Sequence, residues 1–242
     1  MSRQTGIIVG AFAMVLASIL TMTMWPGRTS AADLAEIRAR VTPALESALA
    51  EKGLAFGAPV FIRVFKQEKQ LEVWLKKDEQ FALFKSYPIC NYSGSLGPKQ
   101  KEGDFQSPEG FYYVTRDRLN PNSQYHLSFN LGFPNVFDRQ LDRTGSYLMI
   151  HGDCVSIGCY AITDPAIEEV YLLVEAALNN GQPFFRAHLF PFRMTPENLS
   201  FYEGTQWFSF WQNLKTGYDW FEEKRVPPDV QAKDGVYAFG EG

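Results

Sequence analysis

The sequence lacks an excess of basic residues, because 23 lysines and arginines stand against 27 aspartates and glutamates. Phosphate backbones and anionic lipids are bound by concentrated basic surfaces, so the net charge of −4 argues against a nucleic-acid partner and against a polybasic membrane contact. Internal repeats and low-complexity tracts are also missing. With 45% apolar and 21% charged residues in 242, the chain is predicted to fold as one globular domain with extensions.

No twin-arginine pair occurs near the start of the chain. Arg3 is followed by a charge-free stretch over residues 4–27, and small residues follow at 29–32. A positively charged n-region, an apolar h-region and small residues at a cleavage site are typical of a secretory signal peptide. This apolar run is, however, close to the length of a membrane span. Residues 1–31 are therefore predicted to be a cleaved signal peptide or a retained anchor. Export of the unfolded remainder also disfavours a prebound cofactor.

Cysteine is scarce, with only Cys90, Cys154 and Cys159 in the chain. In an oxidising compartment an odd number of cysteines leaves one thiol over, and the sequence allows three pairings. Cys154 and Cys159 are close enough to bridge within a loop, but a reactive thiol needs to stay free. We favour a pair between Cys90 and Cys154 that leaves Cys159. Three reduced thiols remain the alternative.

Hydrophobic periodicity predicts a mainly β (α+β) fold with a few helices. The helical segments are 33–52, 164–178 and 205–224, the second with Asp164 as N-cap, and the third weakened at Gly217. The strand segments are 60–65, 71–75, 81–87, 111–114, 125–130, 147–150 and 184–192. A loop and a short final strand are expected after residue 224.

The chemistry concentrates in residues 149–160, where an apolar strand ends at His151 and Cys159 follows eight positions later. A thiol nucleophile needs a base within hydrogen-bond reach, and a loop of this length is able to fold back and bring the two together. Gly158 leaves room for a substrate carbonyl. The backbone amides of Gly158, Cys159 and Tyr160 are placed to face the oxyanion that forms on attack.

Two other interpretations of this segment compete with a catalytic pair. The histidine and cysteine have packing roles in the first. In the second, zinc is bound by ligands drawn from His151, Asp153, Cys154 and Cys159, although their spacing matches no strong zinc pattern. The remaining histidines, at positions 126 and 188, are predicted to be surface or satisfied core residues.

The same segment resembles the L,D-transpeptidase family of the YkuD type. The family pattern of a histidine–glycine pair followed by Ser/Thr-His-Gly-Cys matches His151-Gly152 and residues 156–159, and a Ser-Pro-x-Gly turn lies at 107–110. The YafK-like subgroup is the nearest match. It shares segments at 92–94, 96–100, 150–161 and 191–194, within a resemblance that extends over residues 59–221.

The resemblance implies an L,D-transpeptidase-type β-sandwich with flanking helices and a C-terminal helical extension. The expected organisation is an N-terminal helix and linker at 32–58, a catalytic domain at 59–196 and the extension at 197–242. It implies Cys159 as nucleophile, His151 as base, and the Gly152 carbonyl as the group that orients the imidazole. No metal and no organic cofactor are implied. The implied partners are peptidoglycan stem peptides and a peptidoglycan-bound lipoprotein, in the periplasm of a Gram-negative envelope.

The predicted function is a periplasmic cysteine enzyme that forms an acyl-enzyme at the diaminopimelate L-centre. It then acts as a transpeptidase, or as an amidase that releases bound lipoprotein. Ile157 replaces the family's second histidine and Ala161 its Arg or Asn, which changes the acceptor side. Lys99 is predicted to meet a stem carboxylate, and Tyr160 to line the slot beside the nucleophile. The alternative is a non-catalytic cell-wall binding module on the same fold, with Cys159 in a disulfide.

Overall fold

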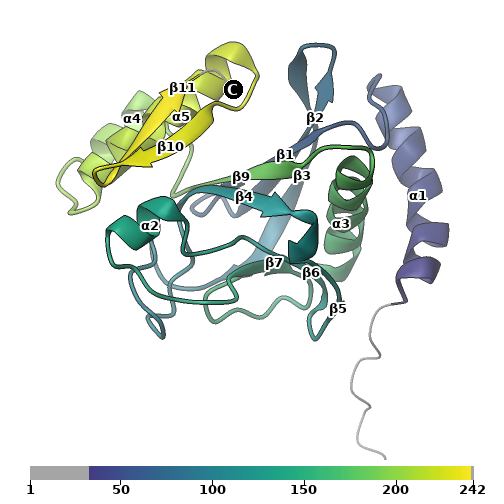
Figure 1. Ribbon diagram of the computed structural model, residues 1–242, viewed down its shortest axis with the longest axis horizontal. Helices are drawn as coiled ribbons and strands as arrows, with labels where there is room; N and C mark the ends of the chain where they lie inside the picture. Colours follow the sequence, from purple (N-terminus) through teal and green to yellow (C-terminus); the bar gives the residue numbers. More distant parts are fainter. Residues whose placement is uncertain (1–32, 241–242) are drawn as a thin grey trace, which may run out of the picture. The chain divides into compact units, whose positions relative to one another are not determined.

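The computed structural model describes residues 33–240 (Figure 1). The predicted signal or anchor segment, residues 1–31, lies outside the described residues. Between residues 33 and 240, no helix is both long and apolar enough to cross a membrane.

Nine strands form one mixed, hydrogen-bonded sheet in the order β4-β9-β1-β2-β3-β8-β7-β6-β5. The strands are β1 (Val60–Phe65), β2 (Gln70–Lys77), β3 (Gln80–Tyr92), β4 (Gly110–Thr115), β5 (Leu119–Ser123), β6 (His126–Asn130), β7 (Met149–His151), β8 (Tyr160–Ile162) and β9 (Phe184–Phe190). The long β3 belongs to both halves, because it pairs with β2 along most of its length and with β8 at its end. The two halves face each other: the rings of Phe129 in β6 and Phe185 in β9 lie 5.3 Å apart. The predicted mainly β sandwich is confirmed.

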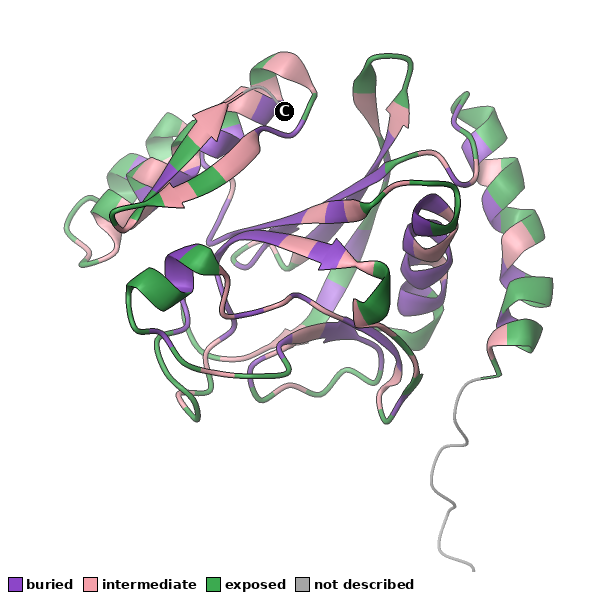
Figure 2. Ribbon diagram, in the orientation of Figure 1, coloured by how far each residue is buried: buried purple, intermediate pink, exposed green. Residues whose placement is uncertain are grey.

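Helix α3 (Asp164–Asn179) packs on β1, β6, β7 and β9, and its buried face closes the core (Figure 2). Helix α1 (Leu34–Glu51) packs on α3 through four buried aliphatic residues at helical spacing, Ile37, Val41, Leu45 and Leu49. Both predicted helices are confirmed. The predicted N-cap of α3 is wrong by one residue, because Thr163 holds that position and the Asp164 carboxylate accepts a hydrogen bond from Asp153 N at 2.8 Å.

The C-terminal extension contains α4 (Pro196–Phe201), α5 (Phe208–Lys224) and a hairpin of β10 (Asp229–Lys233) and β11 (Val236–Gly240). Helix α5 confirms the predicted amphipathic segment, with Trp211, Leu214 and Phe221 on its buried face. The helix continues through Gly217 without a break. A Cβ at this position would lie 2.5 Å from the ring of Phe239 and 2.7 Å from that of Phe111, so glycine lets the hairpin and β4 approach the helix. The hairpin replaces the short final strand of the prediction.

Candidate active site

His151 is the last residue of β7, and its imidazole is 1% exposed. Its Nδ1 lies 2.6 Å from the carbonyl oxygen of Gly152. A carbonyl only accepts hydrogen bonds, so Nδ1 carries the proton and Nε2 is left with a lone pair. Burial lowers the pKa of His151, and this exceeds the opposing effects of the Gly152 carbonyl and Asp153. The side chain is therefore a neutral base at pH 7.

Gly152 is held so that its carbonyl stays on the imidazole. Its N–H donates to the carbonyl oxygens of Tyr125, at 3.1 Å, and Leu127, at 3.3 Å. A Cβ at position 152 would lie 2.5 Å from the Asp164 carboxylate and 3.1 Å from the side chain of Ile167. A side chain here would have to displace the Asp164 carboxylate, so glycine allows this close approach, and the two hydrogen bonds of its N–H hold the backbone that carries the orienting carbonyl.

Cys159 directly precedes β8 and carries an unbridged, partly exposed thiol. Its sulfur accepts a hydrogen bond from Met149 N at 3.4 Å and lies 3.5 Å from the Tyr147 carbonyl oxygen. Strands β7 and β8 run parallel with Ile150 opposite Tyr160, both in the core. Since side chains alternate along a strand, Met149 and His151 point to the other face, where the thiol contacts Met149. No hydrogen bond joins the thiol to His151 in this state.

The charge state of Cys159 follows from its surroundings. Burial raises the pKa of the thiol more than the Met149 N–H and the positive charge of Lys99 lower it. The resting site therefore holds a neutral thiol and a neutral imidazole, and attack by the sulfur requires that a base remove its proton.

A disulfide ties the loop between His151 and Cys159 to the sheet. Cys90 in β3 is bonded to Cys154, with Cα atoms 5.4 Å apart. The neighbouring Asp153 N donates to the Asp164 carboxylate, and the Asn91 amide donates to the Cys154 carbonyl at 3.4 Å. The loop is anchored on β3 and on α3, and Cys159 is the cysteine left unpaired.

Serine hydroxyls hold the backbone of Cys159. Ser107 Oγ and Ser156 Oγ each donate to the Cys159 carbonyl oxygen at 2.9 Å. Ser93 joins both, because its hydroxyl lies 2.8 Å from Ser156 Oγ and its N–H donates to Ser107 Oγ at 3.0 Å. The predictions gave these hydroxyls no role, although Ser107 and Ser156 both lie in the family motifs. The Gly158 N–H donates to Ser156 Oγ at 3.2 Å and is thus occupied in this state.

A cavity of about 340 Å³ opens in front of the thiol. Its walls include Lys99, Glu102, Phe105, Tyr125, Tyr147 and Cys159. His151 lies behind the wall, with its ring centroid 4.7 Å from that of Tyr125. A larger cavity of about 420 Å³, between β4, α2 (Val136–Gln140) and the hairpin, contains none of the predicted site residues. The smaller cavity is therefore the candidate active site.

The two residues predicted to contact substrate, Tyr160 and Lys99, are not free to do so as expected. The Tyr160 side chain is fully buried and its hydroxyl donates to the Pro108 carbonyl at 2.7 Å, so it does not line the slot. Lys99 does line the cavity, but its ammonium is paired with Asp104 at 2.5 Å. Within residues 33–240, no three His, Cys, Asp or Glu side chains gather as a metal site.

The other two histidines lie outside the cavity. His126 is 22% exposed at its side chain and pairs with Glu168 at 2.9 Å. His188 is buried between the rings of Phe61 and Phe111, each 4.6 Å away, and its Nδ1 has no hydrogen-bond partner among the described residues. The prediction of a satisfied core histidine is therefore wrong for His188.

Comparison with known proteins identifies the family. The model of the YkuD family, the L,D-transpeptidase catalytic domain, matches residues 59–206. The chain belongs to the L,D-transpeptidase family. It is 51% identical to the YafK proteins of Escherichia coli strains K12 and O157:H7 over 181 residues, which are 75% of this chain and 74% of each relative.

Two solved structures are similar at lower identity. One is the helical cell shape determining protein Pgp2 of Campylobacter jejuni, with 19% identity, a TM-score of 0.44, and coverage of 78% of this chain and 80% of that one. The other is Bd1075 of Bdellovibrio bacteriovorus, with 17% identity, a TM-score of 0.41, and coverage of 73% and 77%.

In this L,D-transpeptidase-family chain, the buried ion pair of Lys66 and Glu109 supports the turn that contains Ser107. Lys66 is fully buried, and its ammonium lies 3.1 Å from the Glu109 carboxylate. It also donates to the carbonyl oxygens of Ser107, at 2.6 Å, and Gly97, at 2.8 Å. Glu109 in turn accepts from the indole N–H of Trp211 at 2.8 Å. The pair therefore links the turn that holds Cys159 to helix α5.

We expect Lys66→Met to lower the free energy of unfolding by about 3–5 kcal/mol, because it leaves the Glu109 carboxylate buried without a cation. Lys76→Met, at an exposed pair with Glu79, is the matched control and should change stability by less than about 1 kcal/mol. Denaturant unfolding measures both variants. Equal stabilities would show that the buried pair does not support the fold.

The raised pKa of Cys159 predicts that its thiol is alkylated slowly at neutral pH. Since only the thiolate reacts with iodoacetamide, the alkylation rate should still be rising above about pH 8.5, the ordinary cysteine value. At pH 7 the rate should lie below that of an exposed cysteine in a short peptide. Mass spectrometry of the Cys159 peptide across pH 6–10 gives the profile. A rate that levels off below pH 8 would mean a thiolate in the resting site.

Proposed function

We propose that this protein is an exported cysteine enzyme of the bacterial envelope that acts on peptidoglycan stem peptides. Family membership supports the cell-wall substrate, and the charge-free segment at residues 4–27 supports export to the periplasm. The observation that carries the proposal is the unbridged thiol of Cys159, which lines a cavity. It lies on the same face of β7 and β8 as the neutral imidazole of His151.

The reaction begins when the thiol turns from the Tyr147 carbonyl toward His151. The imidazole Nε2 takes the thiol proton, and the sulfur attacks the carbonyl carbon at the L-centre of diaminopimelate. The oxyanion accepts hydrogen bonds from the Cys159 N–H, and from the Gly158 N–H once this leaves Ser156. When the tetrahedral intermediate collapses, the C–N bond breaks and His151 gives its proton to the departing amine. A thioester on Cys159 remains.

The second half-reaction releases the thioester. His151 removes a proton from the incoming nucleophile, which attacks the thioester carbonyl, and the sulfur departs and regains the proton. An amine nucleophile gives a new peptide bond, whereas water gives hydrolysis. The departing amine of the first half is D-alanine or the lysine of an attached lipoprotein. Ile157, 75% exposed at the rim of the cavity, stands where the family has a histidine, so the acceptor side differs from that of its relatives.

The experiment is mass analysis of muropeptides after incubation of the protein with lipoprotein-bearing sacculi. We expect release of lipoprotein or of D-alanine, or a new cross-link, each of which has its own mass. The control is the same protein after iodoacetamide treatment, which modifies only Cys159 because the other two cysteines are bonded to each other. Sacculi left unchanged by the untreated protein would contradict the proposal.

A non-catalytic cell-wall binding module is the second candidate. The disulfide of Cys159 that was expected for it is wrong, because this thiol is unbridged, but one other observation favours it. The Cys159 thiol is neutral and contacts Tyr147 and Met149 rather than the imidazole. A binding module should sediment with sacculi equally well before and after iodoacetamide treatment, without changing any muropeptide. The same incubation therefore separates the two functions.

A further inference from the structure

We propose that the cavity in front of Cys159 contains a subsite for a primary alkylammonium group, formed by the Glu102 carboxylate and the aromatic rings of Phe105, Tyr125 and Tyr147. The inference rests on the proposed function, since the group recognised is the amine partner of the reaction, the one that leaves or attacks. Three observations carry it: the pairing of Lys99, the position of Glu102 and the exposed aromatic rings.

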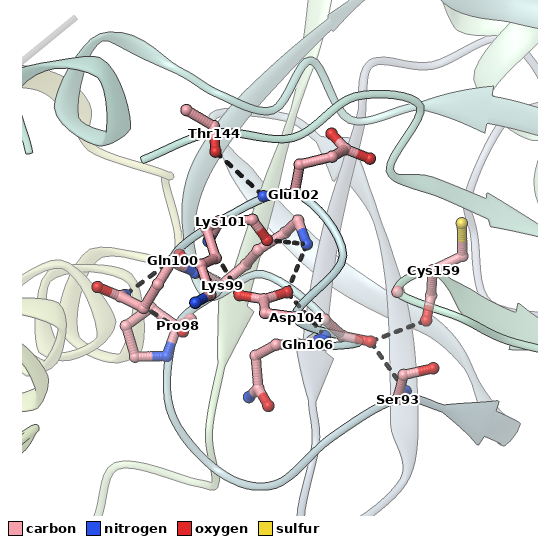
Figure 3. Close-up of polar contacts among 12 residues, drawn as sticks. Ser93, Pro98, Lys99, Gln100, Lys101, Glu102, Asp104, Gln106, Thr144 and Cys159 are labelled. Atoms are coloured by element: carbon pink, nitrogen blue, oxygen red, sulfur yellow. Dashed lines mark hydrogen bonds and ion pairs between the residues drawn. The ribbon is translucent and has the colours of Figure 1, made fainter. Parts of the chain in front are cut away.

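Among residues 33–240, Lys99 is the lysine of the cavity wall, and its positive charge is paired with a carboxylate. The Lys99 ammonium donates to the Asp104 carboxylate at 2.5 Å and to the Lys101 carbonyl at 3.0 Å, and its side chain is 5% exposed. Asp104 also accepts from the backbone N–H groups of Gln100 and Lys101, which fixes the turn (Figure 3). A substrate carboxylate would have to compete with this well-satisfied Asp104, so Lys99 is poorly placed to bind an anion.

Glu102 is the exposed carboxylate in the same wall. It lies at the tip of the 99–104 turn, where its backbone N–H donates to the Thr144 hydroxyl at 3.0 Å. Between residues 33 and 240 no hydrogen bond or ion pair is made by its side-chain oxygens. Figure 3 shows the carboxylate extending from the turn, with the Cys159 sulfur on the neighbouring segment. The unpaired charge at the cavity is therefore the negative charge of Glu102, whose backbone is held by the hydrogen bond to Thr144.

Two aromatic residues of the wall are unusually exposed. Tyr147 is 75% exposed and Phe105 is 62% exposed, and both line the cavity with Tyr125. Both also have positive φ angles, 54° for Tyr147 and 51° for Phe105, which bulky residues rarely adopt. The fold therefore presents these rings to the cavity instead of burying them, at a cost in backbone strain.

Aromatic faces and a carboxylate together suit a cation on an aliphatic chain. The ring faces attract an ammonium through their quadrupoles and pack against methylene groups, while the carboxylate accepts its N–H bonds. The first half of the proposed reaction releases a primary amine next to the sulfur, and in the second half an amine attacks there after its ammonium form has lost one proton to water. After C–N cleavage, a lysine side chain that takes the His151 proton and a second proton from water is such a cation.

The test is titration of the wild-type protein with pentylammonium and, as a neutral probe of equal length, pentan-1-ol, followed by NMR chemical shifts of the cavity residues. We expect pentylammonium to bind more tightly, and Glu102→Gln to weaken its binding by about three- to tenfold while leaving pentan-1-ol unchanged. Glu46→Gln, at an exposed glutamate of α1, is the matched control and should change neither probe.

Equal affinities for the two probes, or an unchanged pentylammonium affinity in Glu102→Gln, would overturn the subsite. The titration involves no turnover, so its failure is distinguishable from failure of the proposed reaction. An enzyme that forms a thioester at Cys159 but does not prefer the ammonium would keep its function and lose this subsite.

Discussion

Replacing Cys159 by alanine should reduce the rate of release or cross-linking by about 10³-fold or more, to the uncatalysed background. Among the described residues, the sulfur makes two long hydrogen bonds, with Met149 N and with the Tyr147 carbonyl. The serine hydroxyls hold the backbone of Cys159 rather than its side chain. The folded structure should therefore survive the change, and the loss should be one of chemistry.

Two controls accompany this variant. The melting temperature of Cys159→Ala should stay within a few degrees of wild type, which shows that the fold is retained. Cys159→Ser keeps the shape of the side chain but offers a weakly nucleophilic hydroxyl, so it should be nearly as inactive as alanine. Muropeptide release at the wild-type rate by either variant would remove the sulfur from the mechanism.

Replacing His151 by glutamine should lower the rate about 10²- to 10⁴-fold, the range that a positioned general base contributes. Glutamine keeps a hydrogen-bond donor for the Gly152 carbonyl but has no lone pair that takes up a proton near pH 7. Because the resting thiol is neutral, the reaction depends on such a base. The lowered pKa of His151 also predicts that activity extends below pH 6.5, the ordinary imidazole value, and falls only once Nε2 is protonated.

The matched control is His126→Gln on the neighbouring strand β6. His126 pairs with Glu168 on α3 and lies outside the cavity wall, so its replacement should change the rate by less than about threefold. Initial rates between pH 5 and 9 for wild type and both variants test the prediction. Equal losses in the two variants would point to general damage to the fold and not to a base.

Much of the fold is predictable from the sequence because hydrophobic periodicity is strong where elements are long. Helix α1 and strands β1 and β2 follow their patterns closely. Strand β5 is not predicted because its sequence, Leu-Asn-Pro-Asn-Ser, has the composition of a turn. Strand β8 spans only Tyr160–Ile162, too few residues for a period to show. In both strands the extended conformation is imposed by pairing with the neighbouring strand, and the local sequence does not reveal this pairing.

The site is predictable only where its residues are close in sequence. Cys159, His151 and Gly152 share one segment, so the motif finds them together. Tyr160 follows Cys159 in sequence but points to the core, as the alternation of side chains along a strand requires. The hydroxyl of Ser107 and the buried Lys66 reach the site from distant strands and turns, and their residue types alone carry no signal for these contacts.

The claim at the centre of this account is a covalent bond between Cys159 and the substrate. A stem peptide with an amide at its diaminopimelate L-centre is mixed with the protein, quenched in acid within seconds and digested for mass spectrometry. We predict that the peptide containing Cys159 gains the mass of the acyl group, and that hydroxylamine removes it. Turnover with an unmodified Cys159, or with the acyl group on another residue, would contradict the account.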